Sequence, residues 1–257
     1  MEINNKELSI IILAAGKGVR MNQDIPKVLT MLDNGNCLIE NLLENIKETS
    51  YIKNVSVVVG FKGQNVIDKL GNKYNYIWQR ETLGTGHAVI QCRNELKGHY
   101  NSHLILYGDM PFISPETIEN IVNIDMEDDS IFSILTLQLN NFEDINSCYM
   151  NFGRIVRDSD GEIIKIVEFK DATDEEKKIT EVNPAIFCIK DEWLWENLDK
   201  INSNNSQKEY YLTDLIALAH NQNIKIKSFI SKNNFEFIGI NTIEQLDFAK
   251  KIGPNVI

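Results

Sequence analysis

A glycine-rich segment near the start of the chain carries the residue types that bind phosphate groups. In residues 13–21 (LAAGKGVRM), an apolar stretch ends in small residues and two glycines. Gly16 and Gly18 allow a sharp turn that aims several backbone N–H groups at one point, where an anion can bind. Positive charge is added by Lys17, Arg20 and Lys27. The segment predicts a phosphate site, with a plain turn carrying solvated lysines as the alternative.

A second segment could read the edge of a base. In residues 79–88 (QRETLGTGHA), Gly84 and Gly86 surround Thr85 just before a predicted helix. Such a turn lets a flat ring approach the backbone, whose N–H and C=O groups can hydrogen-bond to it. A turn that merely starts the helix is the alternative.

A third segment could hold a metal ion. Asp109 follows an apolar stretch in residues 106–111 (LYGDMP). It would then lie at the carboxyl end of a buried strand, where carboxylates often bind Mg²⁺ in phosphoryl transfer. For this motif alone, an Asx turn that caps the next segment is the alternative.

These motifs lie between strands and helices that alternate along the first half of the chain. Apolar stretches predict strands buried on both faces at 8–13, 55–59, 103–107 and 131–139. Periodicity predicts helices between them at 38–47, 64–70, 85–96 and 114–122. This alternation predicts an α/β fold: a Rossmann-like, mostly parallel mixed sheet flanked by helices. Ligands of such sheets bind at the carboxyl ends of the strands, where the three motifs stand.

The second half of the chain has a different pattern. Short stretches at 154–157, 162–169 and 182–189 predict a small antiparallel extension of the sheet. The pattern then predicts a helix at 209–220, strands at 224–230 and 236–240, and a helix at 242–251. Because no low-complexity linker divides the chain, we expect residues 1–257 to form a single domain.

Composition limits the class of protein. The 257 residues carry a formal net charge of −11, and 43 % of them are hydrophobic. The apolar content excludes disorder as the main state, and the acidity argues against a nucleic-acid partner. The sequence contains neither a run of about 18 apolar residues, as a membrane span needs, nor a signal-peptide pattern. Four cysteines without a CxxC pair indicate reduced thiols, so we expect a cytoplasmic protein.

Two other nucleotide-binding motifs can be compared with the glycine-rich segment. A Rossmann dinucleotide fingerprint would need a third glycine where Met21 stands. A Walker A loop would need a GxxxxGK[ST] pattern, which the sequence lacks. A dinucleotide-dependent oxidoreductase is therefore disfavoured.

Taken together and in this order, the motifs resemble those of the sugar-1-phosphate nucleotidylyltransferase family. The likeness is strongest to the uridylyltransferase half of the bacterial bifunctional enzymes that make UDP-N-acetylglucosamine. The signature LxAGxGxRM…PKxL stands at 13–21 and 26–29, Q…LGTGHA at 79 and 83–88, and GDxPL at 108–112, with Phe112 for the last leucine. Further blocks at 153–158, 167–173, 181–183, 209–214 and 239–246 extend the likeness over about residues 8–250.

The resemblance implies transfer of a nucleotidyl group from a nucleoside triphosphate to a sugar 1-phosphate, with Mg²⁺ as cofactor and pyrophosphate as second product. It favours UTP and N-acetylglucosamine 1-phosphate. Alternatives are a cytidylyl- or guanylyltransferase for another sugar phosphate, a phosphonate or an alcohol phosphate, and a nucleotide-sensing module without catalysis. Residues 1–125 would mainly bind the nucleotide, and 126–257 would form the sugar-binding half and the C-terminal helix. We expect a monomer or small homo-oligomer, with no membrane partner.

The resemblance also assigns roles residue by residue. The nucleotide would contact Leu13, Ala14, Ala15, Gly16, Lys17, Gly18, Gln79, Gly84 and Thr85. The catalytic residues would be Arg20, Lys27 and Asp109. The sugar would contact Gly108, Gly153, Glu168 and Asn183. The metal ligands would be Asp109 and Asn241.

The chain departs from the family's pattern in three places. The family's Val-Asn-Thr-Gly reads Val-Asn-Pro-Ala at 182–185, so Pro184 lacks an N–H and Ala185 adds a methyl group. Phe152 stands where the family usually has tyrosine. Both changes alter the expected sugar pocket and leave a different acceptor open. The bifunctional enzymes continue into a left-handed β-helix, whereas this sequence ends at Ile257, so we expect neither acetyltransferase activity nor β-helix trimerisation.

Overall fold

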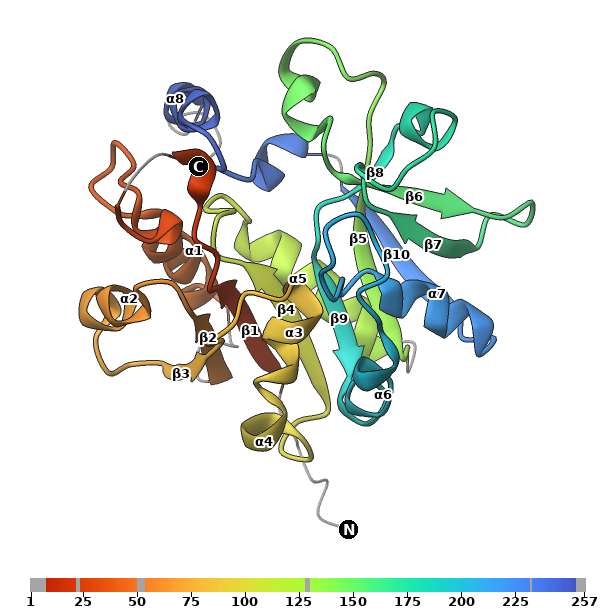
Figure 1. The fold of residues 1–257 in the computed structure, drawn as a ribbon, viewed down its shortest axis with the longest axis horizontal. Helices are drawn as coiled ribbons and strands as arrows, with labels where there is room; N and C mark the ends of the chain where they lie inside the picture. Colours follow the sequence, from red (N-terminus) through yellow and green to blue (C-terminus); the bar gives the residue numbers. More distant parts are fainter. Residues whose placement is uncertain (1–7, 22–23, 50–53, 128–129, 232, 253–257) are drawn as a thin grey trace.

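Within the residues that the structure describes, a ten-stranded mixed sheet is flanked by helices on both faces (Figure 1). The computed structural model describes residues 8–21, 24–49, 54–127, 130–231 and 233–252. The strands are β1 (Ser9–Ala14), β2 (Val55–Val59), β3 (Asn75–Trp78), β4 (Ser102–Tyr107), β5 (Phe132–Gln138), β6 (Gly153–Arg157), β7 (Ile163–Val167), β8 (Glu181–Asn183), β9 (Phe187–Lys190) and β10 (Ile226–Ser231). The helices are α1 (Leu38–Lys47), α2 (Gly63–Leu70), α3 (Thr85–Ile90), α4 (Arg93–Leu96), α5 (Pro115–Glu127), α6 (Asp191–Asn197), α7 (Asp214–Asn221) and α8 (Ile243–Ile252). The predicted α/β class is confirmed.

The parallel part of the sheet has the order β3-β2-β1-β4. β1 pairs in parallel with β2 on one side and with β4 on the other, so that Ile12 lies opposite both Val57 and Leu106. The chain runs from β1 outward to β2 and β3, and then crosses back to β4. The loops that follow β1 and β4 therefore diverge, which leaves a crevice at the carboxyl edge of the sheet.

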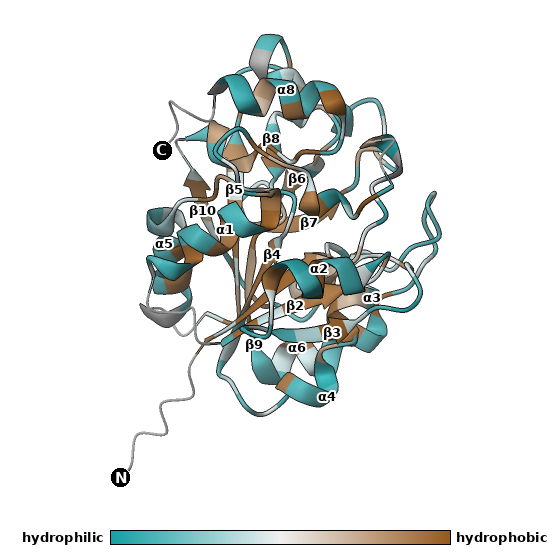
Figure 2. Ribbon diagram, turned by 90° about the vertical axis from the view of Figure 1, so that its left-hand side faces the viewer, coloured by the Kyte–Doolittle hydropathy of each residue, from teal (hydrophilic) through white to brown (hydrophobic). Residues whose placement is uncertain are grey.

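Successive residues of β1 face opposite layers of helices. Ile10 and Ile12 belong to a core cluster with side chains of α1 and α5, whereas Ile11 and Leu13 belong to a cluster with side chains of α3 and α6. Figure 2 shows the mainly hydrophobic strands between helices of mixed hydropathy. All of β1 is buried, which explains why its sequence reads as a continuous apolar run instead of alternating.

The predicted strand 182–189 is interrupted in the structure. β8 pairs with β5 and β6, and β9 pairs with β4 and β5, so the chain changes partners between them. Pro184 has no N–H for a ladder, and Ala185 adopts a left-handed φ of +61°. Oδ1 of Asn183 accepts a hydrogen bond from the Ala185 N–H at 2.9 Å. A local turn therefore replaces strand pairing at this point.

Three further predictions of elements need correction, and one strand was not predicted. The predicted helix 209–220 is wrong in its first part, because α7 begins at Asp214 and the Tyr210 N–H donates to the Leu83 carbonyl at 2.8 Å. The predicted strand 236–240 is wrong, because Asn234–Phe237 forms a 3₁₀ turn. The predicted helix 85–96 is divided into α3 and α4. β3, an edge strand of four residues, was not predicted.

Two expectations from composition can also be compared with the structure. The four cysteines are free thiols, of which Cys37, Cys92 and Cys188 are buried and Cys148 is half-buried. Burial raises the pKa of the Cys37 thiol to about 12 and that of Cys148 to about 11, so both are held protonated. In the part of the chain that the structure describes, every helix is too short or too polar to cross a bilayer.

Candidate functional site

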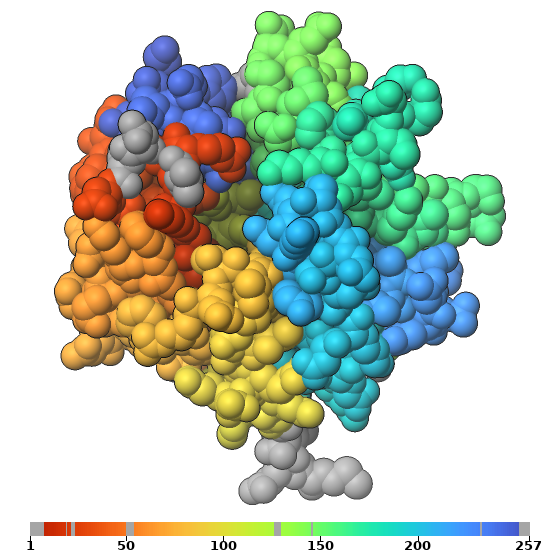
Figure 3. Space-filling view, viewed as in Figure 1, coloured from red at the N-terminus to blue at the C-terminus, as the bar shows by residue number. Residues whose placement is uncertain are grey.

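A cleft of about 560 Å³ opens where the loops after β1 and β4 diverge. Figure 3 shows the hollow between the N-terminal segments, coloured red to yellow, and the segments coloured green to blue. Every residue assigned to the site from the sequence lines this cleft, except Gly108. The Gly108 N–H donates to the Leu13 carbonyl at 3.0 Å, and its Cα faces Val28 and Ile12. Gly108 therefore ties β4 to β1 behind the cleft wall.

The two glycines of the first motif have different structural roles. Gly18 has a φ of +61°, and a Cβ there would lie 2.6 Å from Cβ of Lys27. Both the conformation and the close approach require glycine at this position. Gly16 has ordinary backbone geometry, and a Cβ there would have no heavy atom within 4 Å. The turn thus depends on Gly18, while the space over Gly16 is open to a ligand.

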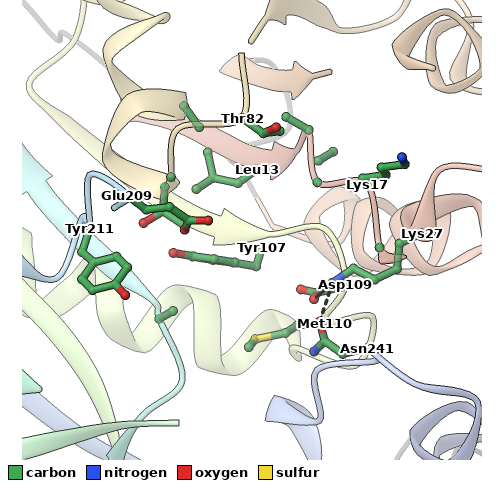
Figure 4. Close-up of a pocket in the computed structure, with 18 of the residues that line it drawn as sticks. Leu13, Lys17, Lys27, Thr82, Tyr107, Asp109, Met110, Glu209, Tyr211 and Asn241 are labelled. Atoms are coloured by element: carbon green, nitrogen blue, oxygen red, sulfur yellow. Dashed lines mark hydrogen bonds and ion pairs between the residues drawn. The ribbon is translucent and has the colours of Figure 1, made fainter. Parts of the chain in front are cut away.

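Three motifs that are far apart in the sequence meet at the cationic end of the cleft (Figure 4). The Lys27 ammonium forms an ion pair with Asp109 and donates to Oδ1 of Asn241 at 2.7 Å. Nη2 of Arg20 donates to the same oxygen at 3.2 Å. The Ile240 N–H donates to the Asp109 carbonyl at 3.0 Å. This bond fixes the segment that carries Asn241, residues 239–246, against the segment that carries Asp109.

The oxygens of Asp109 and Asn241 fit a divalent cation. Both bond to the same ammonium, that of Lys27, so they converge on one cation position. Carboxylate and amide oxygens are the ligand type that Mg²⁺ prefers. Among the described residues, no group of three or more His, Cys, Asp and Glu side chains could hold a metal. A Mg²⁺ ion bound here would therefore need further oxygens, which phosphates and water can supply.

The second motif is held by internal hydrogen bonds. Nε2 of the buried Gln79 donates to the Gly84 carbonyl at 3.0 Å and lies 3.1 Å from Nδ1 of His87. Gly84 has a φ of +109°, and a Cβ there would lie 2.6 Å from the Tyr210 carbonyl oxygen. The Gly86 N–H donates to that same oxygen at 2.8 Å. The Tyr210 backbone therefore occupies the side of these glycines where a Cβ would lie. Gly84 also lines the cleft, and the approach of a flat ring from that side stays a prediction.

The opposite end of the cleft is acidic. Oε1 of Glu168 accepts a hydrogen bond from the Thr213 hydroxyl at 2.9 Å. Burial raises the pKa of Glu168; the Thr213 hydrogen bond opposes this, and the charge of Asp214 adds to it. Burial also raises the pKa of Glu209. Gly153 lies beside Glu168: a Cβ there would lie 2.8 Å from Cγ2 of Ile166 and 3.5 Å from Oε1 of Glu168.

Several lining residues had no assigned role in the sequence analysis. Those with polar side chains include Thr82, Tyr107, Asn151, Gln207, Glu209, Tyr211 and Thr213. In Figure 4 the Tyr107 ring lies between Glu209 and Tyr211 on one side and Lys27 and Asp109 on the other. Burial raises the pKa of the Tyr107 hydroxyl, so it stays protonated. The block 209–214 was noted in the sequence, but no feature of its residue types distinguished contact with the cleft from packing.

Comparison with known proteins finds a matching domain model and a related protein. Residues 10–134 match the family described as MobA-like NTP transferase domain. The chain is 40 % identical over 246 residues to the bifunctional protein GlmU of Francisella tularensis subsp. novicida (strain U112), which is 95 % of this chain. Residues 10–134 are thus similar to a MobA-like NTP transferase domain. The chain spans 51 % of the length of the GlmU protein that it matches. The match to an NTP transferase domain agrees with the nucleotidyltransferase that the sequence predicts.

Solved structures of other transferases share the fold. UDP-glucose pyrophosphorylase, solved with UDP-glucose, superposes with a TM-score of 0.76 at 15 % identity, over 96 % of this chain and 98 % of the other. CMP:2-keto-3-deoxy-manno-octonic acid synthetase, solved with CTP, gives a TM-score of 0.71 at 16 % identity, over 98 % and 100 %. At these identities the likeness concerns the fold alone, and it confirms the mostly parallel mixed α/β sheet flanked by helices.

Proposed function

We propose that this chain transfers the uridylyl group of UTP to a sugar 1-phosphate, N-acetylglucosamine 1-phosphate first among them, and releases pyrophosphate. One observation carries the proposal: Lys27, Asp109 and Asn241 meet in a cleft that is also lined by the hydrogen-bonding side chains of Glu168 and Asn183. The 40 % identity to GlmU over 95 % of this chain supports it.

The reaction is an in-line displacement at the α-phosphorus of the nucleotide. A phosphate oxygen of the acceptor forms the new O–P bond, and the bond to pyrophosphate breaks with its electron pair on the leaving oxygen. The attacking oxygen is already an anion, so no residue has to remove a proton. The protein's task is alignment and neutralisation of charge. Lys17, Arg20 and Lys27 at one end of the cleft supply this positive charge.

Asp109 and Asn241 would hold the Mg²⁺ that the sequence predicts. Their oxygens already face one cation, the Lys27 ammonium, which supports a divalent ion at this place. When bound, Mg²⁺ offsets the negative charge of the two phosphate groups that approach each other. Lys27 then has its ammonium available for phosphate oxygens.

The hydrogen bonds of Gln79 support uracil over cytosine. Its Nε2 donates to the Gly84 carbonyl and lies 3.1 Å from Nδ1 of His87, so Oε1 is the amide atom left for a base. The side chain can then only accept a hydrogen bond from a base. At the ring position, the N3–H of uracil and the N1–H of guanine donate, whereas N3 of cytosine accepts and only its exocyclic N4 amino group donates. The resemblance to uridylyltransferases selects uracil from these.

The acceptor end offers both kinds of hydrogen-bonding group. Oδ1 of Asn183 accepts a hydrogen bond from the Ala185 N–H, which leaves Nδ2 of Asn183 as a donor in the cleft. Oε1 of Glu168 accepts a hydrogen bond from the Thr213 hydroxyl, which leaves Oε2 of Glu168 as an acceptor. Hydroxyl and amide groups of an N-acetylated sugar can satisfy both. A donor and an acceptor side by side therefore support a sugar at this end.

A second candidate function is the same transfer to a different acceptor. Phe152 and Ala185, where the chain departs from the family's pattern, both line the acceptor end of the cleft. Ala185 places a methyl group there, and Phe152 lacks a phenolic hydroxyl. This candidate changes the sugar pocket but not the chemistry at Lys27 and Asp109. The cytoplasmic location and the oligomeric state stay predictions.

Identification of the product tests the proposal. The purified protein is incubated with UTP, N-acetylglucosamine 1-phosphate and Mg²⁺. The products are separated by anion exchange and identified by mass spectrometry. The proposal expects UDP-N-acetylglucosamine and pyrophosphate in equal amounts. A different nucleotide sugar from other substrates would support the second candidate. No product with any acceptor, from protein with native circular dichroism, would contradict both.

A further inference from the structure

A backbone bridge connects the nucleotide side of the cleft to the acceptor side. The Tyr210 N–H donates to the Leu83 carbonyl, and the Gly86 N–H donates to the Tyr210 carbonyl, both at 2.8 Å. The third bond differs, because the Leu212 N–H donates at 3.0 Å to Oγ1 of Thr85 and not to a backbone carbonyl. The bridge therefore depends at one end on a side chain.

The bridge packs closely along its length. A Cβ at Gly84 would lie 2.7 Å from the Tyr210 nitrogen and 2.6 Å from its oxygen, and a Cβ at Gly86 would lie 3.1 Å from that oxygen. Leu212 is fully buried, so its N–H has no access to water. If Thr85 stopped accepting this hydrogen, a buried donor would be left unpaired, which is unfavourable.

The residue after Leu212 reaches the acceptor end. Thr213 is buried, and its hydroxyl donates to Oε1 of Glu168 at 2.9 Å. This bond orients the Glu168 carboxylate and lowers its pKa against the effect of burial. A continuous path thus runs from Oγ1 of Thr85 through the Leu212 N–H and the Thr213 hydroxyl to Glu168.

We propose that Thr85, although it stands in the motif assigned to the nucleotide, is a positioning residue for the acceptor, acting through Leu212 and Thr213 on Glu168. The inference rests on the proposed function for the identity of the acceptor. The orientation of the bridge does not depend on it. Oγ1 of Thr85 also hydrogen-bonds to Tyr107, so the test must separate these two partners.

Three variants make the separation. Thr85→Val keeps the shape of the side chain and removes the hydroxyl, Thr85→Ser keeps the hydroxyl, and Tyr107→Phe removes the other partner. In Thr85→Val we expect amide exchange at Leu212 to accelerate about tenfold, as expected for a lost hydrogen bond. Thr85→Ser and Tyr107→Phe should exchange at this amide as the wild type does. Unchanged exchange in Thr85→Val, or equal acceleration in Tyr107→Phe, would overturn the inference.

Kinetics test the functional half of the inference. Thr85→Val should raise KM for the acceptor about five- to tenfold, with KM for the nucleotide changed less than about twofold, and Thr85→Ser should restore the acceptor KM. A rise in the nucleotide KM as large as that in the acceptor KM would overturn the positioning role. If the wild type transferred to no acceptor, the proposed function would fail, while the exchange experiment would still decide whether Thr85 holds the bridge.

Discussion

The Lys27 ammonium donates a hydrogen bond to Oδ1 of Asn241 at 2.7 Å, although the two residues come from the first and the last motif of the chain. The same ammonium pairs with Asp109, and the side chains of Lys27 and Asp109 are only 13 % and 11 % exposed. The lysine thus neutralises the Asp109 carboxylate and hydrogen-bonds to the Asn241 amide oxygen, the two groups that we propose as metal ligands. The cationic end of the cleft is held together by its own charges.

Removal of the lysine should strengthen metal binding to the free protein. In Lys27→Met no cation competes for Asp109 and Asn241, so Mn²⁺ should bind about tenfold more tightly, or by about 1.4 kcal/mol, in the absence of nucleotide. Electron paramagnetic resonance of free Mn²⁺ measures this. Lys62→Met, which removes a lysine paired with the exposed Asp24, is the control and should bind Mn²⁺ like the wild type. Equal or weaker binding by Lys27→Met would show that the ammonium does not compete for the site.

Loss of the strand-end carboxylate should abolish most of the activity without unfolding the protein. Asp109→Ala and Lys27→Ala should each lower kcat by about 10²–10³-fold, because each removes charge stabilisation of the transferring phosphate. Asp199→Asn is a matched control, since this carboxylate is 62 % exposed and pairs with Arg93 away from the cleft. Its kcat should match the wild type. Steady-state rates and circular dichroism together decide, and an active, folded Asp109→Ala would remove this residue from the mechanism.

The strands that bear the site could be predicted because their signal is local. β1, β2 and β4 are continuous apolar runs, and their predicted bounds agree with the structure within one residue at each end. The pattern predicts a helix over residues 209–213. In the structure, the Tyr210 N–H instead donates to the Leu83 carbonyl, and the Tyr210 carbonyl accepts from the Gly86 N–H. Such pairing between distant segments leaves no periodic pattern in the sequence, so it could not be predicted.

The same distinction separates the predicted site residues from those that were missed. Glycines and lysines after a buried strand, and a carboxylate at a strand end, indicate a binding site by their residue type and position. The cleft contains these residues. Tyr107 and Thr213 are as common in packed interiors as in binding sites, so their types gave no signal. Only the fold brings Thr213 to Glu168.

The left-handed alanine at the acceptor end should cost stability. Ala185 has a φ of +61°, where the Cβ of an L-residue is crowded by about 1–2 kcal/mol and glycine is not. Ala185→Gly should therefore raise the free energy of unfolding by about 0.5–1 kcal/mol after the greater entropy of the unfolded chain is subtracted. Chemical denaturation measures this.

A matched alanine gives the contrast. Ala217 lies within α7 with helical geometry, so Ala217→Gly should lower the free energy of unfolding by about 1 kcal/mol. If both glycine variants were destabilised equally, the backbone strain assigned to Ala185 would be absent.

One carboxyl near the acceptor end should make stability depend on pH. Burial, followed by the charge of Asp171, raises the pKa of Asp214 from 3.8 to about 6. Because the folded pKa exceeds the unfolded one, the stabilisation is full below pH 3.8 and is lost as pH rises through about 6. Asp214→Asn lacks this loss, so its stability relative to the wild type should rise between pH 4 and 7 by about 1 kcal/mol, allowing for partial exposure.

Thermal unfolding at several pH values tests this expectation. The difference in Tm between Asp214→Asn and the wild type should widen from pH 4 to pH 7. Asp160→Asn, in the exposed turn between β6 and β7, should show a constant difference. A constant difference for Asp214→Asn as well would mean that Asp214 titrates alike in the folded and unfolded chain.

The rate of pyrophosphate release tests the proposed function most directly. The purified protein with Mg²⁺ is given each of UTP, CTP, GTP, ATP and dTTP, crossed with a panel of sugar 1-phosphates that includes N-acetylglucosamine 1-phosphate. Our account predicts the highest kcat/KM for UTP with N-acetylglucosamine 1-phosphate, and at least a 10²-fold loss of that rate in Asp109→Ala. Release that is fastest with CTP, or undiminished by Asp109→Ala, would contradict it.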